Sequence, residues 1–327
     1  MLHAYCPRAG VLDKHVVAAG GPLPPDALWL DLISPTPDEE ALVELGLNLG
    51  VPTREEMVEI EPSSRLYVEN GARVMTGSVV CAADTEHPKL AAVSFILRAG
   101  RLVTVRYDQP TPFNILQSRL GRSCPAKPGG EQILLDLLDA IVDRAADILE
   151  RLGAEIDLVS NRVFERNGAR DDASQRYRAI LRVLGRKADL ASKVRESLVS
   201  IARLVTFLAA DTDGQAPSLS KEQRATLKSM HRDATSLTDH VSYLGDKITF
   251  LLDATLGMVS IEQNNIIKIF AVLSVVLMPP TLIASVYGMN FTHMPELTET
   301  WGYPIALFAM LVAAVLPYAF FKWKRWL

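Results

Sequence analysis

The chain has 327 residues and a formal charge of -4, with 49% hydrophobic and 22% charged residues. This balance argues against a general nucleic-acid-binding protein, which normally shows a basic face or stripe. The three cysteines, Cys6, Cys81 and Cys124, are too few and too scattered for a disulfide framework or a CxxC metal site. The first residues lack the basic region and apolar run of a signal peptide, so we expect the soluble part to stay in the cytoplasm.

Residues 1–125 are expected to form a cytoplasmic α/β domain. Helix starts are indicated where proline, threonine and acidic residues follow one another, after Thr36 and after Pro52. A linker rich in Gly, Pro and Ser follows around Gly121–Gly130. Runs rich in strand-forming residues predict four strands, over Leu28–Ile33, Arg73–Ala82, Leu90–Leu97 and Arg101–Arg106.

Residues 131–266 are expected to form a helical stalk, because apolar residues recur there every three or four positions. The pattern predicts helices over about 131–166 and 172–210, and a third that begins near residue 218. The third helix shows no break before Asn290. At about 1.5 Å per residue it would be roughly 110 Å long, far longer than a globular helix, so it must leave the soluble body.

Residues 267–327 are expected to form a transmembrane domain. Two uncharged apolar runs, Ile269–Tyr287 and Gly302–Phe321, are each long enough to cross a hydrocarbon core, and they predict transmembrane helices over about 267–288 and 302–321. The loop over 289–301 carries acidic residues without Lys or Arg, whereas the tail over 322–327 is basic. By the positive-inside rule the loop faces outside and both termini lie in the cytoplasm.

One face of the first membrane helix is small and weakly polar. Such a face is typical of a close-packed helix interface and also of a pore wall. Steps of three and four back from Gly288 trace this stripe through Ser285, Thr281, Met278, Ser274, Ala271, Ile267 and Asn264.

Acidic residues continue this stripe towards the cytoplasm. Heptad-like steps give Ser260, Asp253, Asp246 and Asp239. In a symmetric assembly of parallel helices these acids would form stacked carboxylate rings, which concentrate cations at a pore mouth. As charges on an ordinary solvated stalk they would need no further explanation. Because two crossings cannot enclose a channel, a conducting protein must form a ring of identical subunits with this helix inside.

The end of the first membrane helix carries a specific signature. Residues 287–290 read Tyr-Gly-Met-Asn, and Met-Pro-Glu-Leu follows over 294–297. Placed between two C-terminal apolar spans and before a basic tail, this signature resembles that of the CorA family of magnesium transporters. The run Trp-Leu-Asp-Leu over 29–32 extends the similarity to the N-terminal part.

The resemblance implies a funnel-shaped homopentamer in the inner (plasma) membrane, with an α/β cytoplasmic domain, a long α-helical stalk and two C-terminal transmembrane helices per subunit. It implies uptake of Mg2+, driven by the membrane potential, through a central pore lined by the first membrane helix. Mg2+ is then the transported ion and a regulatory ligand, and no organic cofactor or nucleic acid is expected. In this family Mg2+ is sensed between cytoplasmic domains; the corresponding stalk position is Ser229, with Asp233 one turn later, so no sensor residue is assigned.

The resemblance also implies roles for individual residues. Gly288, Met289 and Asn290 would form the selectivity filter, with Asn290 contacting the ion. Met278 would help to form the constriction, and Asp253 an acidic ring at the cytoplasmic mouth. Mg2+ releases its water reluctantly, so a ring of neutral amide oxygens suits the hydrated ion. In the outer loop, Glu296 and Glu299 would attract cations.

Two other readings stay open. The first is a Zn2+ transporter of the sibling ZntB-like branch, although Met289 favours Mg2+; hydrated Co2+ and Ni2+ would also pass such a filter. The second is a membrane-tethered coiled-coil adaptor or signalling protein. An enzyme is not expected, because the sequence has no phosphate-binding Gly loop, HExxH motif or nucleophile elbow.

Overall fold

The computed structural model describes the chain apart from residues 9, 19, 60, 124–128, 166–172, 211–218, 290–293, 295–298 and 325–327. By internal contacts the chain forms two compact units. The first contains Met1–Arg166 and Ile180–Leu252, and the second contains Asn167–Ala179 and Asp253–Leu327. The predicted α/β domain and most of the predicted stalk therefore lie together in the first unit.

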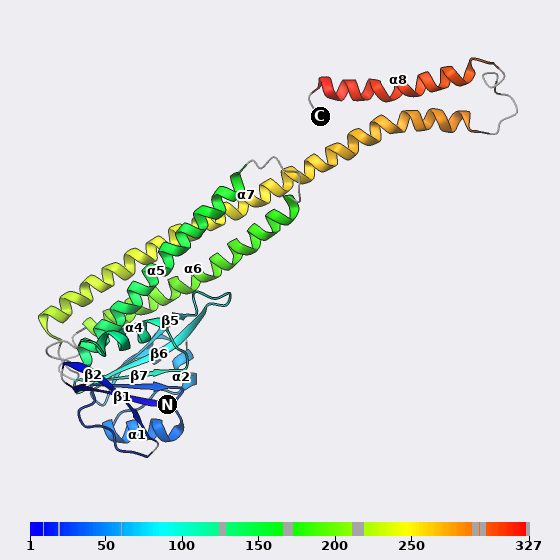
Figure 1. Cartoon of the computed structure of the whole chain (residues 1–327). Helices are drawn as coiled ribbons and strands as arrows, with labels where there is room; N and C mark the ends of the chain where they lie inside the picture. The colour runs from blue at the N-terminus through cyan, green and yellow to red at the C-terminus, as the bar shows by residue number, and fades with distance from the viewer. Residues whose placement is uncertain are drawn as a thin grey trace. The chain divides into compact units, whose positions relative to one another are not determined.

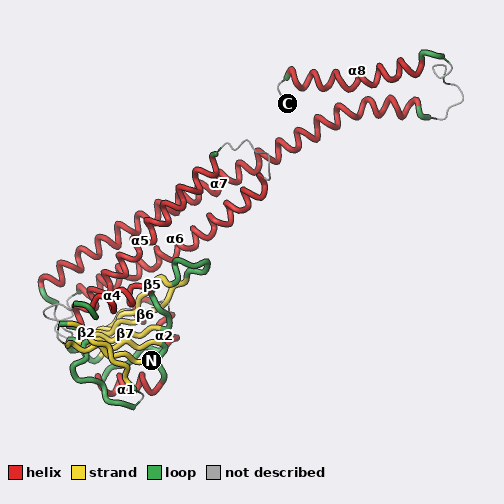
Figure 2. The backbone as a smooth tube through the Cα atoms, in the orientation of Figure 1, coloured by secondary structure: helices red, strands yellow, loops and turns green. Residues whose placement is uncertain are grey.

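A seven-stranded sheet lies at the centre of the first unit (Figure 2). Its strand order is β2-β1-β3-β7-β6-β5-β4, and every neighbouring pair is antiparallel except β3 and β7. The strands span Leu2–Arg8 (β1), Val11–Val17 (β2), Trp29–Ile33 (β3), Leu66–Glu69 (β4), Ala72–Cys81 (β5), Lys89–Arg98 (β6) and Arg101–Arg106 (β7).

Short helices cover one face of the sheet. They are α1 (Pro37–Leu47) and α2 (Arg54–Val58), and the short helix α3 (Pro62–Arg65) follows α2 and leads into β4. Thr36 and Thr53 each form a capping box with the glutamate three residues later, which satisfies backbone donors at the two helix starts. Val43 of α1 and Met57 of α2 belong to the same buried cluster as Leu30 of β3, so these helices seal that face.

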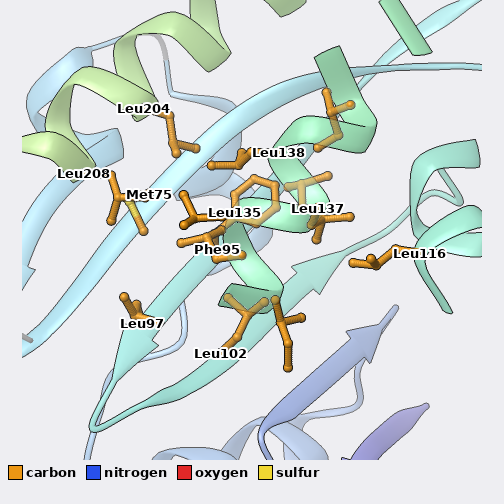
Figure 3. Close-up of a cluster of buried hydrophobic side chains, with 14 of the residues drawn as sticks. Met75, Phe95, Leu97, Leu102, Leu116, Leu135, Leu137, Leu138, Leu204 and Leu208 are labelled. Atoms are coloured by element: carbon orange, nitrogen blue, oxygen red, sulfur yellow. The ribbon is translucent and has the colours of Figure 1, made fainter. Parts of the chain in front are cut away.

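Longer helices cover the other face (Figure 1). They are α4 (Thr111–Leu120), α5 (Gly130–Phe164), α6 (Ala173–Ala209) and the start of α7 (Lys221–Tyr287). Figure 3 shows how Met75 and Phe95 of the sheet meet Leu138 of α5 and Leu204 of α6. Because strands and helices share this core, the sheet holds the starts of α5 and α7 and the end of α6.

A buried ion pair joins the two parallel strands. The carboxylate of Asp31 on β3 accepts hydrogen bonds from Arg106 Nε at 3.0 Å and Nη2 at 2.9 Å. It also accepts from Thr104 Oγ1 at 2.7 Å, and Thr104 Oγ1 itself accepts from Trp29 Nε1 at 2.9 Å. The side chain of Asp31 is fully buried, so this network satisfies charges that have no access to water.

The β5–β6 hairpin reaches the long helices through its tip. Asp84 forms ion pairs with Arg144, at 2.6 Å, and with Arg151, both on α5. The hydrogen bond from Arg151 is the largest cause that lowers the pKa of Asp84. Glu86 pairs with Arg186 of α6 at 2.7 Å. The hairpin thus links α5 to α6.

The fold class expected from the sequence is confirmed. Strands β3, β5, β6 and β7 lie within one residue of the predicted ranges, and helices follow both predicted starts. Strands β1, β2 and β4 and helices α3 and α4 were not predicted. The predicted start of the third long helix, at residue 218, lies outside the described residues.

The second unit contains the remainder of α7 and helix α8 (Gly302–Trp323). Both helices are long and apolar enough to cross a membrane. Large apolar side chains are exposed on each, such as Phe270 at 64% and Phe308 at 67%. Apolar surface of this extent on a soluble protein is unusual and marks contact with lipid or with another protein.

Candidate ion pathway along α7

The predicted pore-lining residues all lie on α7, which continues without interruption through this region. Their side chains are exposed in the single chain: Asn264, Ile267, Ala271, Ser274, Met278, Thr281 and Ser285. Exposure alone does not single them out, because Phe270, Leu273 and Leu282 of the same helix are exposed as well. The distinguishing property is chemical, since the stripe carries the Ser and Thr hydroxyls of residues 267–288 together with the amide of Asn264.

Two hydroxyls of the stripe are oriented by their own helix. Ser274 Oγ donates to the carbonyl oxygen of Phe270, and Thr281 Oγ1 donates to that of Leu277, each at 2.8 Å. Such back-bonding uses the single proton of each hydroxyl. The lone pairs that remain can only accept hydrogen bonds. These two exposed side chains therefore offer oxygen acceptors to groups outside the helix.

A shallow groove runs along this part of α7. Besides the two hydroxyl residues it is lined by Leu273, Leu277, Met278, Leu282 and Ser285. Pro279 and Pro280 lie within the helix beside the groove. Since proline has no N–H, the carbonyls four residues earlier, at Val275 and Val276, lose their helical donor. Free carbonyls of this kind are tolerated in a membrane where the backbone meets protein or water.

The signature at the end of α7 is partly described. Gly288 N donates to Ala284 O at 3.0 Å, and Met289 N donates to Val286 O at 3.3 Å, which closes the last turn. Met289 is 48% exposed. The proposed filter residue Asn290 lies outside the described residues, as does Glu296. Glu299 is described: it is exposed, and its carbonyl accepts from Gly302 N at 3.1 Å at the start of α8.

The acidic residues Asp239, Asp246 and Asp253 are all exposed on α7. None of the three forms a salt bridge with another described residue. Sequence reasoning missed the aromatic residues between them, Tyr243 and Phe250, which are 58% and 61% exposed. The signal was available, because these two residues are also separated by seven positions.

The described part of a single chain gathers no group of three or more His, Cys, Asp or Glu side chains able to hold a metal ion. Isolated carboxylates and hydroxyls along one helix contribute at most one ligand at each level. A cation site on this face would therefore need the same residue from several copies of the chain. Chemically, the face suits a passing hydrated cation better than a resident metal.

Comparison with known proteins gives a consistent result. Residues 26–325 match the family described as "CorA-like Mg2+ transporter protein". Similar proteins named "Magnesium transport protein CorA" occur in Pasteurella multocida, at 36% identity, and in Haemophilus influenzae, at 35%; each alignment covers 92% of both chains.

Two solved structures show a similar fold. The complete CorA magnesium transporter from Methanocaldococcus jannaschii aligns with a TM-score of 0.75 at 17% identity, over 100% of this chain and 99% of that one. The cytoplasmic domain of ZntB from Vibrio parahaemolyticus aligns with a TM-score of 0.57 at 9% identity, over 79% of this chain and 97% of that one. At these identities the likeness establishes the fold alone.

Proposed function

This chain belongs to the CorA family of Mg2+ transport proteins, and we propose that it conducts Mg2+ through a central pore lined by α7 in a ring of identical subunits. It is a membrane transport protein, not an enzyme. The observation that carries the pore proposal is the exposed stripe of α7, on which Ser274 and Thr281 present oxygen acceptors on either side of Met278.

The chemistry of the stripe fits a hydrated ion. Mg2+ holds its water shell tightly and is usually contacted through water. The outer hydrogens of that shell need acceptors, and a back-bonded hydroxyl is an acceptor only. In the proposed pathway, the amide oxygen of Asn290 receives the ion outside, Thr281 and Ser274 hold it on either side of the Met278 constriction, and Asn264 and Asp253 guide it to the cytoplasm.

The proposed driving force is electrical. An inside-negative potential of 100 mV is worth about 2.3 kcal/mol per charge, or roughly 4.6 kcal/mol for a divalent ion. No coupled fuel is therefore needed for uptake. In the outer loop, Glu299 and Glu296 would raise the local cation concentration, an effect that falls at high ionic strength.

The proposed assembly is a homopentamer in the inner membrane with both termini in the cytoplasm. Each chain supplies two spans, too few to enclose a pore. The basic residues Lys322, in the last turn of α8, and Lys324, just after it, favour a cytoplasmic C-terminus. Binding of regulatory Mg2+ between cytoplasmic parts belongs to the same proposal, without assigned residues.

The decisive test is ion flux into liposomes. The purified full-length protein is reconstituted, an inside-negative potential is imposed, and Mg2+, Zn2+, Co2+ and Ni2+ are followed separately. We expect Mg2+ flux that grows with the potential, and Asn290→Ala should abolish it while the oligomer is preserved. Absence of potential-driven flux of any divalent ion refutes the channel. If Zn2+ enters the liposomes and Mg2+ does not, the protein is a Zn2+ transporter instead.

A matched pair of variants tests the stripe itself. Asn264 lies on the stripe, and Asn265 is rotated from it by about 100° around the helix. If the stripe lines the pore, Asn264→Ala should change the Mg2+ flux and Asn265→Ala should not. Equal effects of the two substitutions would remove the assignment of this face to the pore.

A further inference from the structure

A small polar pocket lies at the open edge of β5, within the first unit. Strand β4 pairs only with Ala72–Met75 of β5, so Thr76 and Ser78 have no neighbouring strand on that side among the described residues. Helix α6 passes this edge instead, and Ser200 Oγ of α6 accepts a hydrogen bond from Ser78 N at 3.0 Å. The strand edge and the helix bound a cavity of about 240 Å³, which is lined by Arg65, Leu66, Thr76, Ser78, Glu196, Val199, Ser200 and Arg203.

Two arginines from different elements line this pocket. Arg65, at the end of α3, donates from Nε to the carbonyl oxygen of Glu59 and from Nη2 to that of Val58, the second at 3.4 Å. These bonds hold the guanidinium beside the end of α2 and leave Nη1 without an acceptor among the described residues. Arg203 of α6 is exposed and forms no hydrogen bond or salt bridge with a described residue. Both guanidinium groups therefore have N–H donors available to a ligand.

The rest of the lining leaves these positive charges uncompensated. Glu196 lies about two helical turns before Arg203, is exposed and forms no salt bridge with a described residue. Two arginines and one glutamate give the lining a net formal charge of +1. Ser200 Oγ accepts from Ser78 N and keeps its own proton to donate. Three side chains thus offer donors in a pocket of net positive charge, which suits an anion with several oxygen acceptors.

We propose that this pocket binds a phosphate group, either as inorganic phosphate or as part of a small phosphate ester. A phosphate group carries a charge of about -1.5 to -2 at neutral pH, and its oxygens are strong acceptors. The planar fork of an arginine matches these oxygens with paired hydrogen bonds. The volume of about 240 Å³ is below the roughly 300–1,000 Å³ of pockets for drug-sized ligands, so the ligand is small. No residue of the α7 stripe takes part, and the inference is therefore independent of the proposed pore.

Two other kinds of ligand fit this pocket less well. A metal cation would meet two positive charges and a single carboxylate, that of Glu196. A peptide strand added to the edge of β5 would need the N–H group of Ser78, which already donates to Ser200 Oγ. The unused donors of Arg65 and Arg203 therefore favour an anion over either alternative.

Phosphate binding is tested with the full-length, detergent-solubilised protein in the absence of Mg2+. Isothermal titration calorimetry follows inorganic phosphate and glycerol phosphate at constant ionic strength, with chloride as the reference anion. We expect saturable binding at millimolar concentrations. Arg203→Gln and Arg65→Gln should each weaken it by at least about tenfold, because each removes charge-assisted hydrogen bonds. Arg182→Gln, an exposed position of α6 outside the pocket, is the matched control and should leave the affinity unchanged.

Glu196→Gln gives a second readout of opposite sign, because loss of the negative charge should tighten phosphate binding. Far-UV circular dichroism verifies that each variant is folded. Tighter binding of glycerol phosphate than of inorganic phosphate supports a phosphate ester as the ligand, and the reverse order supports free phosphate. Absence of saturable binding of both probes overturns the inference, as does equal weakening by Arg203→Gln and Arg182→Gln. The measurement involves no ion flux, so a negative result here leaves the proposed pore intact.

Discussion

Replacement of Asp31 by asparagine removes the negative charge at the centre of the network between β3 and β7. The carboxylate is fully buried, and the Arg106 side chain is only 2% exposed. Arg106 donates to both carboxylate oxygens, at 3.0 and 2.9 Å, and Thr104 Oγ1 adds a third bond at 2.7 Å. In the variant the guanidinium would stay buried without its counter-charge.

The expected loss is large because one partner of a buried pair is removed. Such a change costs about 3–5 kcal/mol. For a unit of this size each kcal/mol shifts the unfolding midpoint by about 2–4 °C, so the midpoint should fall by roughly 6–20 °C. Trp29 offers a local probe, because its Nε1 donates to Thr104 at 2.9 Å. Tryptophan emission and far-UV circular dichroism are followed during heating of the detergent-solubilised protein.

Two controls separate the lost charge from general damage. Asp31→Leu combined with Arg106→Met removes both charges and should recover most of the loss, because no unpaired ion stays buried. Asp38→Asn changes an exposed acid in the first turn of α1 and should shift the midpoint much less. If Asp31→Asn lowers the midpoint no further than Asp38→Asn, the buried pair does not stabilise the sheet as argued.

Three further predictions concern a close contact, a pH effect and the constriction. Gly130→Ala should lower stability by about 1–3 kcal/mol, because the new Cβ would lie 2.5 Å from the β7 backbone; Gly185→Ala, with open space around it, should not. The hydrogen bond from Arg151 lowers the pKa of Asp84, so the ionised side chain stabilises the fold above the unfolded pKa of about 4 and loses this effect as the pH falls. The difference in unfolding free energy between the unmodified protein and Asp84→Asn should therefore shrink as the pH of the denaturation measurement is lowered. Met278→Ala should raise resting Mg2+ flux into liposomes, and an unchanged flux contradicts the constriction.

The sequence predicted those elements in which the spacing of apolar residues matches the faces that the fold buries. Strands β5 and β6 are long apolar runs, and α5 carries apolar residues at helical spacing over 35 residues. The missed elements lack such patterns. Strand β1 pairs on both sides with β2 and β3, and its first five residues are all buried, so it shows no alternation. Strand β4 has only four residues, too few to establish a period.

The same distinction separates the two parts of the candidate site. The stripe from Asn264 to Ser285 lies on one helix, so a period of 3.6 residues places its members on one face whatever packs nearby. The residues that other helices bring close to α7 are not determined in this way. Asp139 approaches Asp233, and Arg203 shares a groove with His231, only because α5 and α6 pack on opposite sides of α7. That packing depends on the shared core with the sheet, which no local pattern contains. Residues that share one face of a helix can thus be read from a local period, whereas residues brought together from different helices become visible only in the folded bundle.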